Sequence, residues 1–513
     1  MRVLLVSANT ERTAIIPLPL GLAFVAAACR RAGHETVLLD LMSEPDATAA
    51  LQKRIEEFRP GAIGISVRNI DDQNMASPKF LLPAVRDVVA VCRRLCDAPI
   101  ILGGPGYSMF PESVLRFLQA DMGIRGEGEA VFPALLERLE SGSDPYGLPG
   151  VYLPGHPAAG VVFSTSLEDL PLPQPELWLP ATRQSRDFWI PVQGKRGCPM
   201  GCSFCATKLI EGTHIRRRSP ESIAQWVEQA AACGFRNFCA VDNTFNIPPS
   251  YAKGLCREII RRGLDVNLWS IVYPKWVDRE LVELMARAGC HEISLGFESG
   301  ADCVLTRFHK RFRAEEVRTI AGMFRDAGIR RTGFLMLGGP GETRETVEES
   351  LAFADSLDLD SLKIAVGIRI YPETDLAATA VAEGMIAPED DLLQPTFYLA
   401  PRIQEWLPPR IAAYKASRSW VMYRAGNARR WRRGAHRLHA VRRAVGTEQR
   451  RVHCPVGARA GATRICRADG GDARLFAFRR PFRKPRTRWI APAGMCSRST
   501  SPNCRKRRRE SPA

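Results

Sequence analysis

The chain is organised around the stretch Lys195-Arg196-Gly197-Cys198-Pro199-Met200-Gly201-Cys202-Ser203-Phe204-Cys205. Its three cysteines have the spacing C-x3-C-x2-C. Thiolates hold iron–sulfur clusters, usually four to a cluster. Three thiolates on one short loop leave one iron of a 4Fe–4S cluster without a protein ligand, and that iron can chelate a small molecule. Gly197 and Gly201 let the backbone fold tightly there, and Phe204 places an apolar group beside the cluster.

Zinc bound by the same cysteines is the alternative. A structural zinc site takes four ligands, and the remaining ligands typically come from a second C-x2-C or from an H-x3-H pair. Neither pair lies near this stretch. The three cysteines therefore favour an iron–sulfur cluster over a zinc site and over three simply buried thiols.

The pattern C-x3-C-x-aromatic-C resembles the signature of the radical S-adenosylmethionine (SAM) superfamily. The resemblance implies a 4Fe–4S cluster on Cys198, Cys202 and Cys205, with Phe204 beside the bound SAM. It implies that the open iron binds the amino and carboxylate groups of SAM, and that the reduced cluster cleaves SAM to a 5′-deoxyadenosyl radical. It also implies an electron donor such as flavodoxin or ferredoxin.

The composition is that of an ordinary globular protein. The chain has 513 residues, of which 45% are hydrophobic and 25% charged, enough for about two to four domains. No apolar run reaches the roughly 20 residues that a membrane span needs, and residues 1–7 read as a first strand rather than a signal peptide. The 15 cysteines lack the spacing of a small disulfide-rich domain, which favours a reducing cytoplasm.

The basic charge belongs to one end of the chain. The net charge is +17, but residues 425–513 contain 25 Lys and Arg against 4 Asp and Glu, so residues 1–424 are slightly acidic. A charge run of this kind is usually disordered, and it can bind nucleic acid through phosphates. The Arg, Ala, Pro, Gly and Cys mixture is also what a shifted reading frame of a GC-rich gene produces. We favour the frame shift, and expect neither nucleic acid nor a membrane as partner.

The first 141 residues alternate short apolar runs with helical patterns. This alternation predicts a doubly wound, Rossmann-like parallel sheet with helices on both faces. Ligands of such sheets bind beyond the carboxyl ends of the strands. We expect strands at 3–6, 36–40, 62–66, 100–102 and 122–124, and helices at 20–31, 47–58, 80–96, 111–118 and 129–139.

The order of a sheet domain before the cysteine loop resembles the cobalamin-binding radical SAM proteins. The resemblance implies that this domain holds a corrin and its nucleotide tail. The residues that match the family's binding segments are Ser66, Arg68, Asn69, Gly103, Gly104, Gly106, Gly126 and Glu127.

One departure from the family pattern concerns the lower face of cobalt. The usual D-x-H-x-x-G motif, whose histidine ligates cobalt, is absent, and neither His34 nor His156 has that context. In family members without it, a loop lies under the corrin, and residues 66–69 stand at the corresponding place. Arg68 would then block water from the cobalt without coordinating it. The alternative is a surface arginine that pairs with Asp71 or Asp72.

The rest of the chain divides into a linker, a core and a cap. Residues 142–188 are rich in Pro and Gly and predict a linker, with a small hairpin at 150–153 and 161–164. Residues 189–390 repeat strand and helix about six times, which the resemblance identifies as the partial (β/α)6 radical SAM barrel. The expected strands are 190–193, 237–241, 268–272, 291–296, 332–337 and 362–370. The aromatic-rich segment 391–424 is expected to form a helical cap over the barrel mouth.

The strand ends of this core match the family's SAM-binding positions. By resemblance, Asp242 and Asn243 bind the methionine amino group, and Glu298 and Ser299 lie near the ribose and carboxylate. Arg313 is a candidate for the carboxylate, although a generic salt-bridged arginine fits equally. Residues 338–343, Gly-Gly-Pro-Gly-Glu-Thr, resemble the loop beside the adenine, and each of these loops taken alone is also an ordinary turn after a strand.

These matches imply a cobalamin-dependent radical SAM methyltransferase. Its target would be an unactivated carbon, or a phosphinate phosphorus, of a small-molecule precursor such as an antibiotic intermediate. The alternative is a cobalamin-dependent radical SAM cyclase or rearrangement enzyme without methyl transfer. A methylthiotransferase fits less well, because it wants further cluster cysteines upstream of Cys198. The sequence identifies no residue as an acid–base catalyst.

Overall fold

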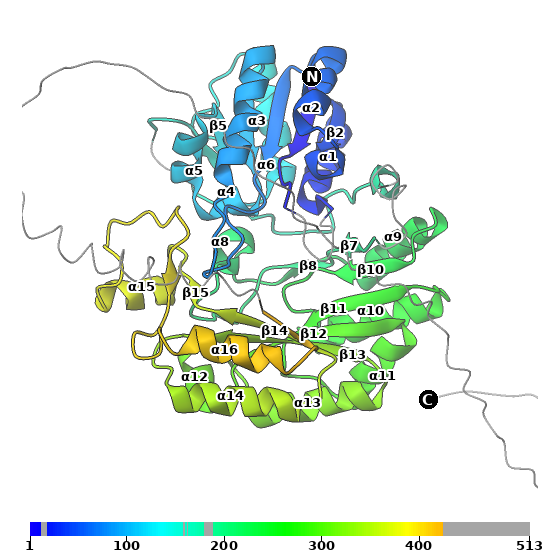
Figure 1. Cartoon of the computed structure of the whole chain (residues 1–513). Coiled ribbons are helices and arrows are strands. Elements are labelled where there is room, and N and C mark those ends of the chain that lie inside the picture. The colour runs from blue at the N-terminus through cyan, green and yellow to red at the C-terminus, as the bar shows by residue number, and fades with distance from the viewer. Residues whose placement is uncertain (12–17, 157–159, 162, 179–187, 424–513) are drawn as a thin grey trace, which may run out of the picture. The chain divides into compact units, whose positions relative to one another are not determined.

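The computed structural model of the chain describes residues 1–11, 18–156, 160–161, 163–178 and 188–423 (Figure 1). All of them belong to one compact unit of the chain. The expected basic tail, 425–513, lies outside the described residues. Among the described residues, no helix combines the length and the apolar character that a membrane crossing requires.

The first part of the chain forms a six-stranded sheet in the order β2-β1-β3-β4-β5-β6. Its first five strands are parallel, and the apolar runs within them are buried, as residues 3–6 of β1 illustrate. The strands are β1 (Arg2–Ser7), β2 (Glu35–Asp40), β3 (Ala62–Ser66), β4 (Ile100–Gly103), β5 (Met122–Ile124) and β6 (Val151–Tyr152).

Helices cover both faces of this first sheet. Helix α1 packs on α6, while α2 and α5 pack on α3 (Figure 1). The doubly wound fold predicted from the alternation is thereby confirmed. The helices are α1 (Leu20–Arg31), α2 (Ala47–Phe58), α3 (Leu82–Leu95), α4 (Pro105–Met109), α5 (Pro111–Leu118) and α6 (Gly128–Glu140), with a short 3₁₀ turn η1 (Leu41–Ser43) after β2.

The expected linker contributes to the first sheet. Strand β6 pairs antiparallel with β5, joining Tyr152 to Gly123 and Val151 to Ile124. This pairing replaces the small hairpin expected within the linker, because the edge of β5 offers unpaired backbone groups to the returning chain. A second 3₁₀ turn, η2 (Pro175–Trp178), follows later in the linker.

The second part of the chain forms a seven-stranded parallel sheet in the order β17-β14-β13-β12-β11-β10-β7. Six of its strands follow one another in sequence, as a partial (β/α)6 barrel requires, which confirms the predicted fold. The strands are β7 (Ile190–Val192), β10 (Asn237–Ala240), β11 (Asn267–Val272), β12 (Cys290–Glu298), β13 (Arg330–Leu337), β14 (Ser361–Val366) and β17 (Val421–Met422).

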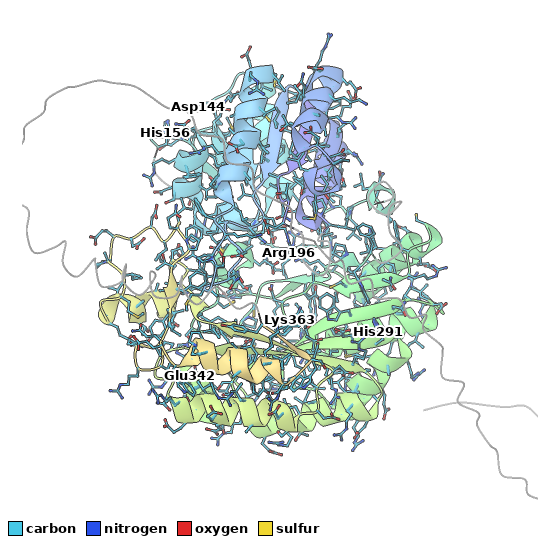
Figure 2. The ribbon with its side chains drawn as sticks, viewed as in Figure 1. Asp144, His156, Arg196, His291, Glu342 and Lys363 are labelled. Carbon is cyan, nitrogen blue, oxygen red and sulfur yellow. The ribbon has the colours of Figure 1, made fainter. Side chains whose placement is uncertain are left out.

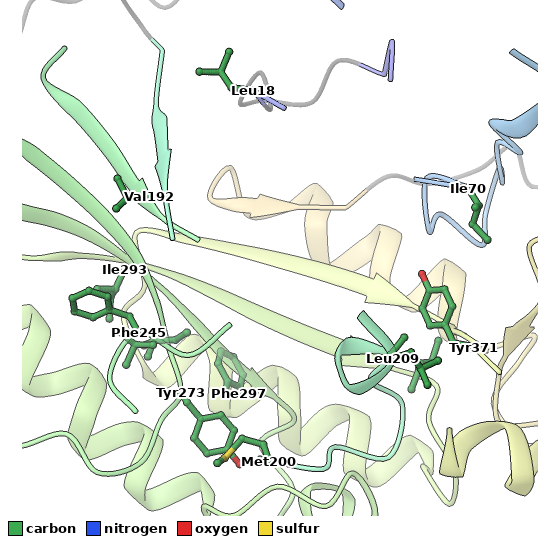
Figure 3. Close-up of a cluster of buried hydrophobic side chains, with 14 of the residues drawn as sticks. Leu18, Ile70, Val192, Met200, Leu209, Phe245, Tyr273, Ile293, Phe297 and Tyr371 are labelled. Atoms are coloured by element: carbon green, nitrogen blue, oxygen red, sulfur yellow. The ribbon is translucent and has the colours of Figure 1, made fainter. Parts of the chain in front are cut away.

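Helices connect these strands and cover one face of the sheet. Phe297 of β12 meets Phe353 on this face with ring centroids 5.8 Å apart, and Ile293 and Leu295 are buried there (Figure 3). The opposite face keeps partly exposed side chains, such as Trp269 and Phe334. The helices are α9 (Pro220–Ala232), α10 (Pro249–Arg261), α11 (Arg279–Arg287), α12 (Asp302–Arg307), α13 (Ala314–Asp326) and α14 (Arg344–Ser356).

Shorter elements lie around this sheet. Two antiparallel pairs form, one between β8 and β9 and one between β15 and β16. The elements are β8 (Lys195–Arg196), α8 (Thr207–Glu211), β9 (Arg216–Arg217), β15 (Ile368–Arg369), α15 (Asp375–Ala382), β16 (Phe397–Tyr398) and α16 (Leu407–Ala416).

The segment expected to be a helical cap continues the barrel wall instead. It contains one helix, α16, but β17 pairs parallel with β14 and extends the sheet. Helix α16 lies along α14, where the Arg410 guanidinium donates to Glu348 at 2.6 Å and the Tyr414 hydroxyl donates to Asp355 at 2.7 Å. The aromatic residues that suggested a cap therefore serve in part to attach a further β/α layer.

Candidate active site

The three cysteines of the motif lie on one tight loop after β8. Gly197 has φ +90°, and a Cβ there would stand 2.0 Å from the His214 carbonyl oxygen, so the loop requires glycine at this point. The Cys205 N–H donates to the Cys202 carbonyl at 3.1 Å, which closes a turn. All three cysteines are half-buried free thiols. The backbone therefore confines the three cysteines to one short, tightly turned loop.

The three thiols influence one another electrostatically. Burial raises the pKa of Cys198 to about 11, and the neighbouring thiols of Cys205 and Cys202 add to the rise. The thiols therefore favour their protonated form, and a bound metal would reverse this because metal ligation deprotonates a thiol. Among the described residues, no three Cys, His, Asp or Glu side chains are grouped to hold a single metal ion.

The loop is fixed by the segment that follows α12. The Ser203 N–H donates to the Phe308 carbonyl at 3.2 Å, and the Arg311 guanidinium donates to the Pro199 carbonyl at 2.8 Å. The Phe204 ring stands edge-on to the Phe308 ring, with centroids 5.3 Å apart. These contacts hold the cysteine loop from both of its ends.

Lys310 lies in this same segment, and its side chain is almost completely buried beside the cysteine loop. Its ammonium is 3.3 Å from a Glu298 carboxylate oxygen and 5.3 Å from the centroid of the Phe204 ring. Burial lowers the pKa of Lys310, but the charges of Glu298 and Cys202 outweigh it and raise the pKa to about 12. Burial raises the pKa of Cys202, and Lys310 opposes that rise by charge and hydrogen bonding.

Sequence reasoning missed Lys310 and selected Arg313 instead. Arg313 is exposed at the start of α13, away from the cysteine loop. Of the two cations, Lys310 is therefore the one that is buried beside the cysteine loop, and Arg313 lies at the surface. The available signal was a second basic residue three positions earlier, but the sequence does not show which of the two side chains turns inward.

The carboxylate of Asp242 is bonded to groups within the protein. One oxygen accepts from the backbone N–H groups of Gly194 at 2.8 Å and Lys195 at 3.0 Å, and the other is 3.6 Å from the Lys195 ammonium. Asp242 is 2% exposed. Burial and these contacts tie the carboxylate of Asp242 to Lys195 within the protein. The same Lys195 ammonium donates to three carbonyls after β10.

Two other expected SAM residues also have partners within the protein. The Asn243 side-chain amide donates to Glu211, which in turn accepts the Gly197 N–H at 3.1 Å, so Asn243 acts beside the cysteine loop through Glu211. The Ser299 hydroxyl is fully buried, bonds with Ser350 at 2.9 Å and accepts an N–H of the following turn. Ser299 therefore shapes the end of β12, whereas Glu298 and Phe204 do lie beside Cys202.

The expected corrin residues meet at the carboxyl end of the first sheet. Ser66 is in register with Gly103 on the neighbouring strand. Gly104 has φ +94°, and a Cβ there would stand 2.8 Å from the Ser66 hydroxyl. The Gly106 N–H donates to the Val67 carbonyl at 2.9 Å. The glycines thus pack the loop after β4 directly on the loop at 66–69.

Arg68 is exposed, and the structure gives it neither of the partners named as alternatives. Asp71 instead pairs with Arg369 at 2.7 Å, and Asp72 accepts the Lys79 N–H at 3.0 Å. Desolvation by the surrounding protein lowers the pKa of Arg68, and the negative charge of Asp40 opposes this change. The side chain nevertheless remains exposed to water. Asn69, next to it, is half-buried.

Glu127 differs from its expected role beside the corrin. It is buried, and its carboxylate lies 3.3 Å from Arg196 and 2.5 Å from Arg216, while it also accepts the Ser164 N–H at 2.7 Å. Glu129, which the sequence did not single out, pairs with the same Arg196. These carboxylates tie the first sheet to the strand just before the cysteines (Figure 2). The Gly126 N–H donates to Ser108 at 3.0 Å.

A second set of contacts ties the segment just after residues 66–69 to β15 and the residues that follow it. Besides the Asp71–Arg369 pair, the Gln73 amide donates to the Tyr371 hydroxyl at 2.6 Å. Ile70 and Tyr371 belong to one continuous apolar core (Figure 3). The segment directly after residues 66–69 is thereby anchored near the cysteine side of the molecule.

The residues present fit both groups that the resemblance implies. Three thiols lie on a loop that turns at a glycine, and the buried Lys310 ammonium lies beside one of them. This arrangement suits an iron–sulfur cluster that carries an additional ligand. On the first sheet, a Cβ added at Gly103 would meet nothing within 4 Å, so its backbone faces open space. That space and the exposed Arg68 suit a broad ligand that approaches the backbone closely.

Comparison with known families agrees with this arrangement. Residues 192–354 match the Radical SAM superfamily, and residues 9–136 match the B12 binding domain. Together the two matches cover more than half of the chain.

Two curated relatives are methyltransferases by name. One is an uncharacterised methyltransferase of Pyrococcus horikoshii, 26% identical over 72% of this chain and 79% of its own length. The other is the tryptophan 2-C-methyltransferase of Streptomyces laurentii, 25% identical over 70% of this chain and 71% of its own.

A solved structure shares the fold. The radical SAM methyltransferase TsrM of Kitasatospora setae, determined with cobalamin and a [4Fe-4S] cluster, superposes with a TM-score of 0.73 at 21% identity. The likeness covers 87% of this chain and 100% of that one. With both domains matched in this order, the chain belongs to the cobalamin-binding radical SAM family.

Proposed function

We propose that this protein is a cobalamin-dependent radical SAM methyltransferase that methylates an unactivated carbon, or a phosphinate phosphorus, of a small molecule. The observation that carries the proposal is the direct connection of the first sheet to the second part of the chain: Glu127 pairs with Arg196 in the strand just before the cysteines, and Asp71, just after residues 66–69, pairs with Arg369 of β15. The two relatives named as methyltransferases support it. Ordinary methyl transfer from SAM to a nucleophile needs neither loop.

When bound, the cofactors supply a SAM-derived radical that abstracts hydrogen and a corrinoid-borne methyl group. The protein supplies orientation. Cys198, Cys202 and Cys205 hold the cluster and leave one iron free. The Lys310 ammonium, balanced by Glu298, stands where it would attract the carboxylate of SAM, and Phe204 packs against that ligand.

The first sheet supplies the corrin site through its backbone. The residues we assign to it are Ser66, Arg68, Asn69, Gly103, Gly104, Gly106 and Gly126. Arg68 would exclude water from the lower face of cobalt, since its side chain is exposed at the loop and its guanidinium stays charged. We do not assign Glu127 to this group, because its carboxylate pairs with Arg196 and Arg216.

We further propose that a flavodoxin or ferredoxin delivers the electron and that the enzyme works in the cytoplasm. An exposed iron–sulfur cluster is stable only under reducing conditions. The substrate is proposed as a small-molecule precursor of a secondary metabolite such as an antibiotic.

Anaerobic reconstitution with iron, sulfide and cobalamin tests the function without a known substrate. After reduction of the bound cobalamin to its cob(I) state by a low-potential chemical reductant such as titanium(III) citrate, we expect bound iron and corrinoid, and transfer of the label from methyl-deuterated SAM to the corrinoid, read by mass spectrometry. Failure to bind either cofactor, or absence of labelled methylcobalamin, would overturn the proposal. A cyclase or rearrangement enzyme would also bind both cofactors but would leave the corrinoid unlabelled.

A further inference from the structure

One face of the second sheet points away from the helices and carries a row of side chains in register. Phe334 of β13 pairs with Lys363 of β14, and Lys363 pairs with Met422 of β17. Ile271 and Ser294 pair in the same way on β11 and β12. Figure 2 labels Lys363 on the side of the sheet opposite to α13 and α14. We call this surface the inner wall of the barrel.

The inner wall is unusually apolar for a surface that water reaches. Ile271 is 38% exposed and Met422 is 44% exposed, two of the four large hydrophobic side chains that are exposed within the described residues. Trp269 is half-buried two residues before Ile271 on β11, with its indole N–H donating to Ser294 at 3.1 Å, whereas Met422 lies on β17, four strands along the sheet. Exposed apolar patches bordered by polar groups mark ligand-binding surfaces.

Lys363 is the cation of this wall, and it has no carboxylate within 4.0 Å among the residues that the structure describes. Its ammonium lies over the face of the Phe334 ring, 5.0 Å from the centroid. Desolvation lowers its pKa, while the charge of Glu292 opposes this. A half-buried charge without a partner is costly, and a bound anion removes that cost.

The neighbouring charges are already neutralised. Glu292 accepts the Thr332 hydroxyl at 2.9 Å and lies 3.9 Å from Arg330. Lys310 is paired with Glu298, and Lys195 with Asp242. Of these three buried or half-buried lysines, Lys363 alone is left to meet a ligand.

The position of Lys363 relative to the strand ends sets a length for that ligand. Through the register of β12, β13 and β14, Lys363 lies level with Gly296, two residues before Glu298. Two residues of strand span roughly 7 Å. A molecule of ordinary metabolite size can therefore reach from the cysteine end of the barrel down to Lys363.

We propose that Lys363 binds a carboxylate of the substrate and that the apolar or aromatic body of the substrate lies beside Phe334 and Met422, on the side of Lys363 that faces the cysteine end of the barrel. A single ammonium suits a carboxylate, whereas phosphate groups usually require several donors or a helix N-terminus. This inference rests on the proposed function and narrows its substrate to an apolar or aromatic carboxylic acid.

Binding of three probes of equal body size tests the inference. Indole-3-propionate, neutral indole-3-propionamide and cationic tryptamine are titrated into the reconstituted full-length protein. We expect the acid to bind at least tenfold more tightly than the other two. We expect Lys363→Met to abolish that preference and Lys363→Arg to restore part of it. Lys253→Met is the matched control, since Lys253 lies on α10 in a surface ion pair.

Two outcomes overturn the inference: no preference for the acid in the unaltered protein, including no binding at all, or an unchanged preference in Lys363→Met. Iron and corrinoid contents of each variant show whether it has folded. Labelling of the corrinoid by SAM needs no substrate, so failure of the proposed function is recognised separately from failure of this inference.

Discussion

The strand ends of the two sheets offer ligands different chemical groups. The first sheet offers backbone: Gly104 and Gly106 pack on the loop at 66–69, and Gly103 faces open space. The second sheet offers side chains, the three thiols and the Lys310–Glu298 pair. Both sheets nevertheless end in glycine-rich loops that look alike in sequence.

The glycine loop of the second sheet shows why the likeness is misleading. The backbone N–H of Gly339 donates to Glu342 at 2.8 Å, and the N–H of Gly338 donates to the same oxygen. A Cβ at Gly338 would stand 2.3 Å from Leu399, and one at Gly339 would stand 2.5 Å from Phe308. These glycines serve packing, and their donors are already used. Glycine after a strand therefore marks crowding as readily as it marks a ligand.

The largest expected effect is the loss of the iron–sulfur cluster without any loss of corrinoid binding by the first sheet. Cys202→Ala should remove the cluster, because two thiolates cannot hold it in place of three. Iron content should fall to background, while corrinoid binding, which depends on the first sheet, should persist. Cys303→Ala, an exposed cysteine on α12, is the control and should retain its iron. Full iron content in Cys202→Ala would contradict the assignment.

The next largest effect concerns the buried ion pairs that connect the first sheet to the strand before the cysteines. Arg196 is buried between Glu127 and Glu129, and Arg196→Met leaves both carboxylates without it. Breaking a buried ion pair costs about 3–5 kcal/mol, so the free energy of unfolding from urea titration should fall by about that amount. Arg325→Met, an exposed arginine paired with Asp326, should change it by less than about 0.5 kcal/mol. If the two variants lower the free energy of unfolding equally, the ion pairs of Arg196 do not stabilise the fold.

What could be predicted from the sequence depended on how local the determinants are. The cluster motif lies within eight residues, and the strands follow from local periodicity, so both were predicted. The second sheet has the expected six strands because each repeats the same short pattern. The extra strand β17 has two residues and was missed, since its pairing depends on the exposed edge of β14.

The partners of the candidate side chains could not be predicted where the partner is distant in sequence. Asp242 meets Lys195, 47 residues away along the chain, and Glu127 meets Arg196. A motif match identifies the position of such a carboxylate but not its partner. Lys310 and Arg313 illustrate the same limit over three residues, because only the packing of the Phe308–Arg311 segment on the cysteine loop decides which cation is buried.

Glu342 makes the glycine loop of the second sheet pH-sensitive. Burial raises its pKa from an ordinary 4.5 to about 7, although the two backbone donors oppose the rise. The unfolded chain therefore loses this proton at lower pH than the folded protein does. Stability should fall as pH rises from about 4.5 to about 7, by up to about 3 kcal/mol, and stay level above.

Glu342→Gln should remove that slope. Relative to the unaltered protein, the variant should gain stability between pH 5 and pH 8, measured by urea titration at each pH. Glu56→Gln, on the exposed face of α2, is the control and should follow the unaltered protein. Parallel curves for Glu342→Gln and the unaltered protein would refute the raised pKa and weaken the view that this loop is occupied by its own carboxylate.

The smallest expected effect tests the first sheet with two adjacent glycines. Gly104→Ala forces an L-residue to φ +94°, which costs about 1–2 kcal/mol, and its methyl meets the Ser66 hydroxyl at 2.8 Å. Because this displaces the loop at 66–69, the fold should weaken and corrinoid affinity should fall. Gly103→Ala should leave stability unchanged, since its methyl meets nothing within 4 Å, yet it should still weaken corrinoid binding because the methyl occupies the ligand's space. Spectral titration with hydroxocobalamin measures both affinities, and iron content should remain normal in both variants. If Gly103→Ala binds the corrinoid as tightly as the unaltered protein, the open space beside it is not the corrin site, and the two glycine loops differ less than their contacts suggest.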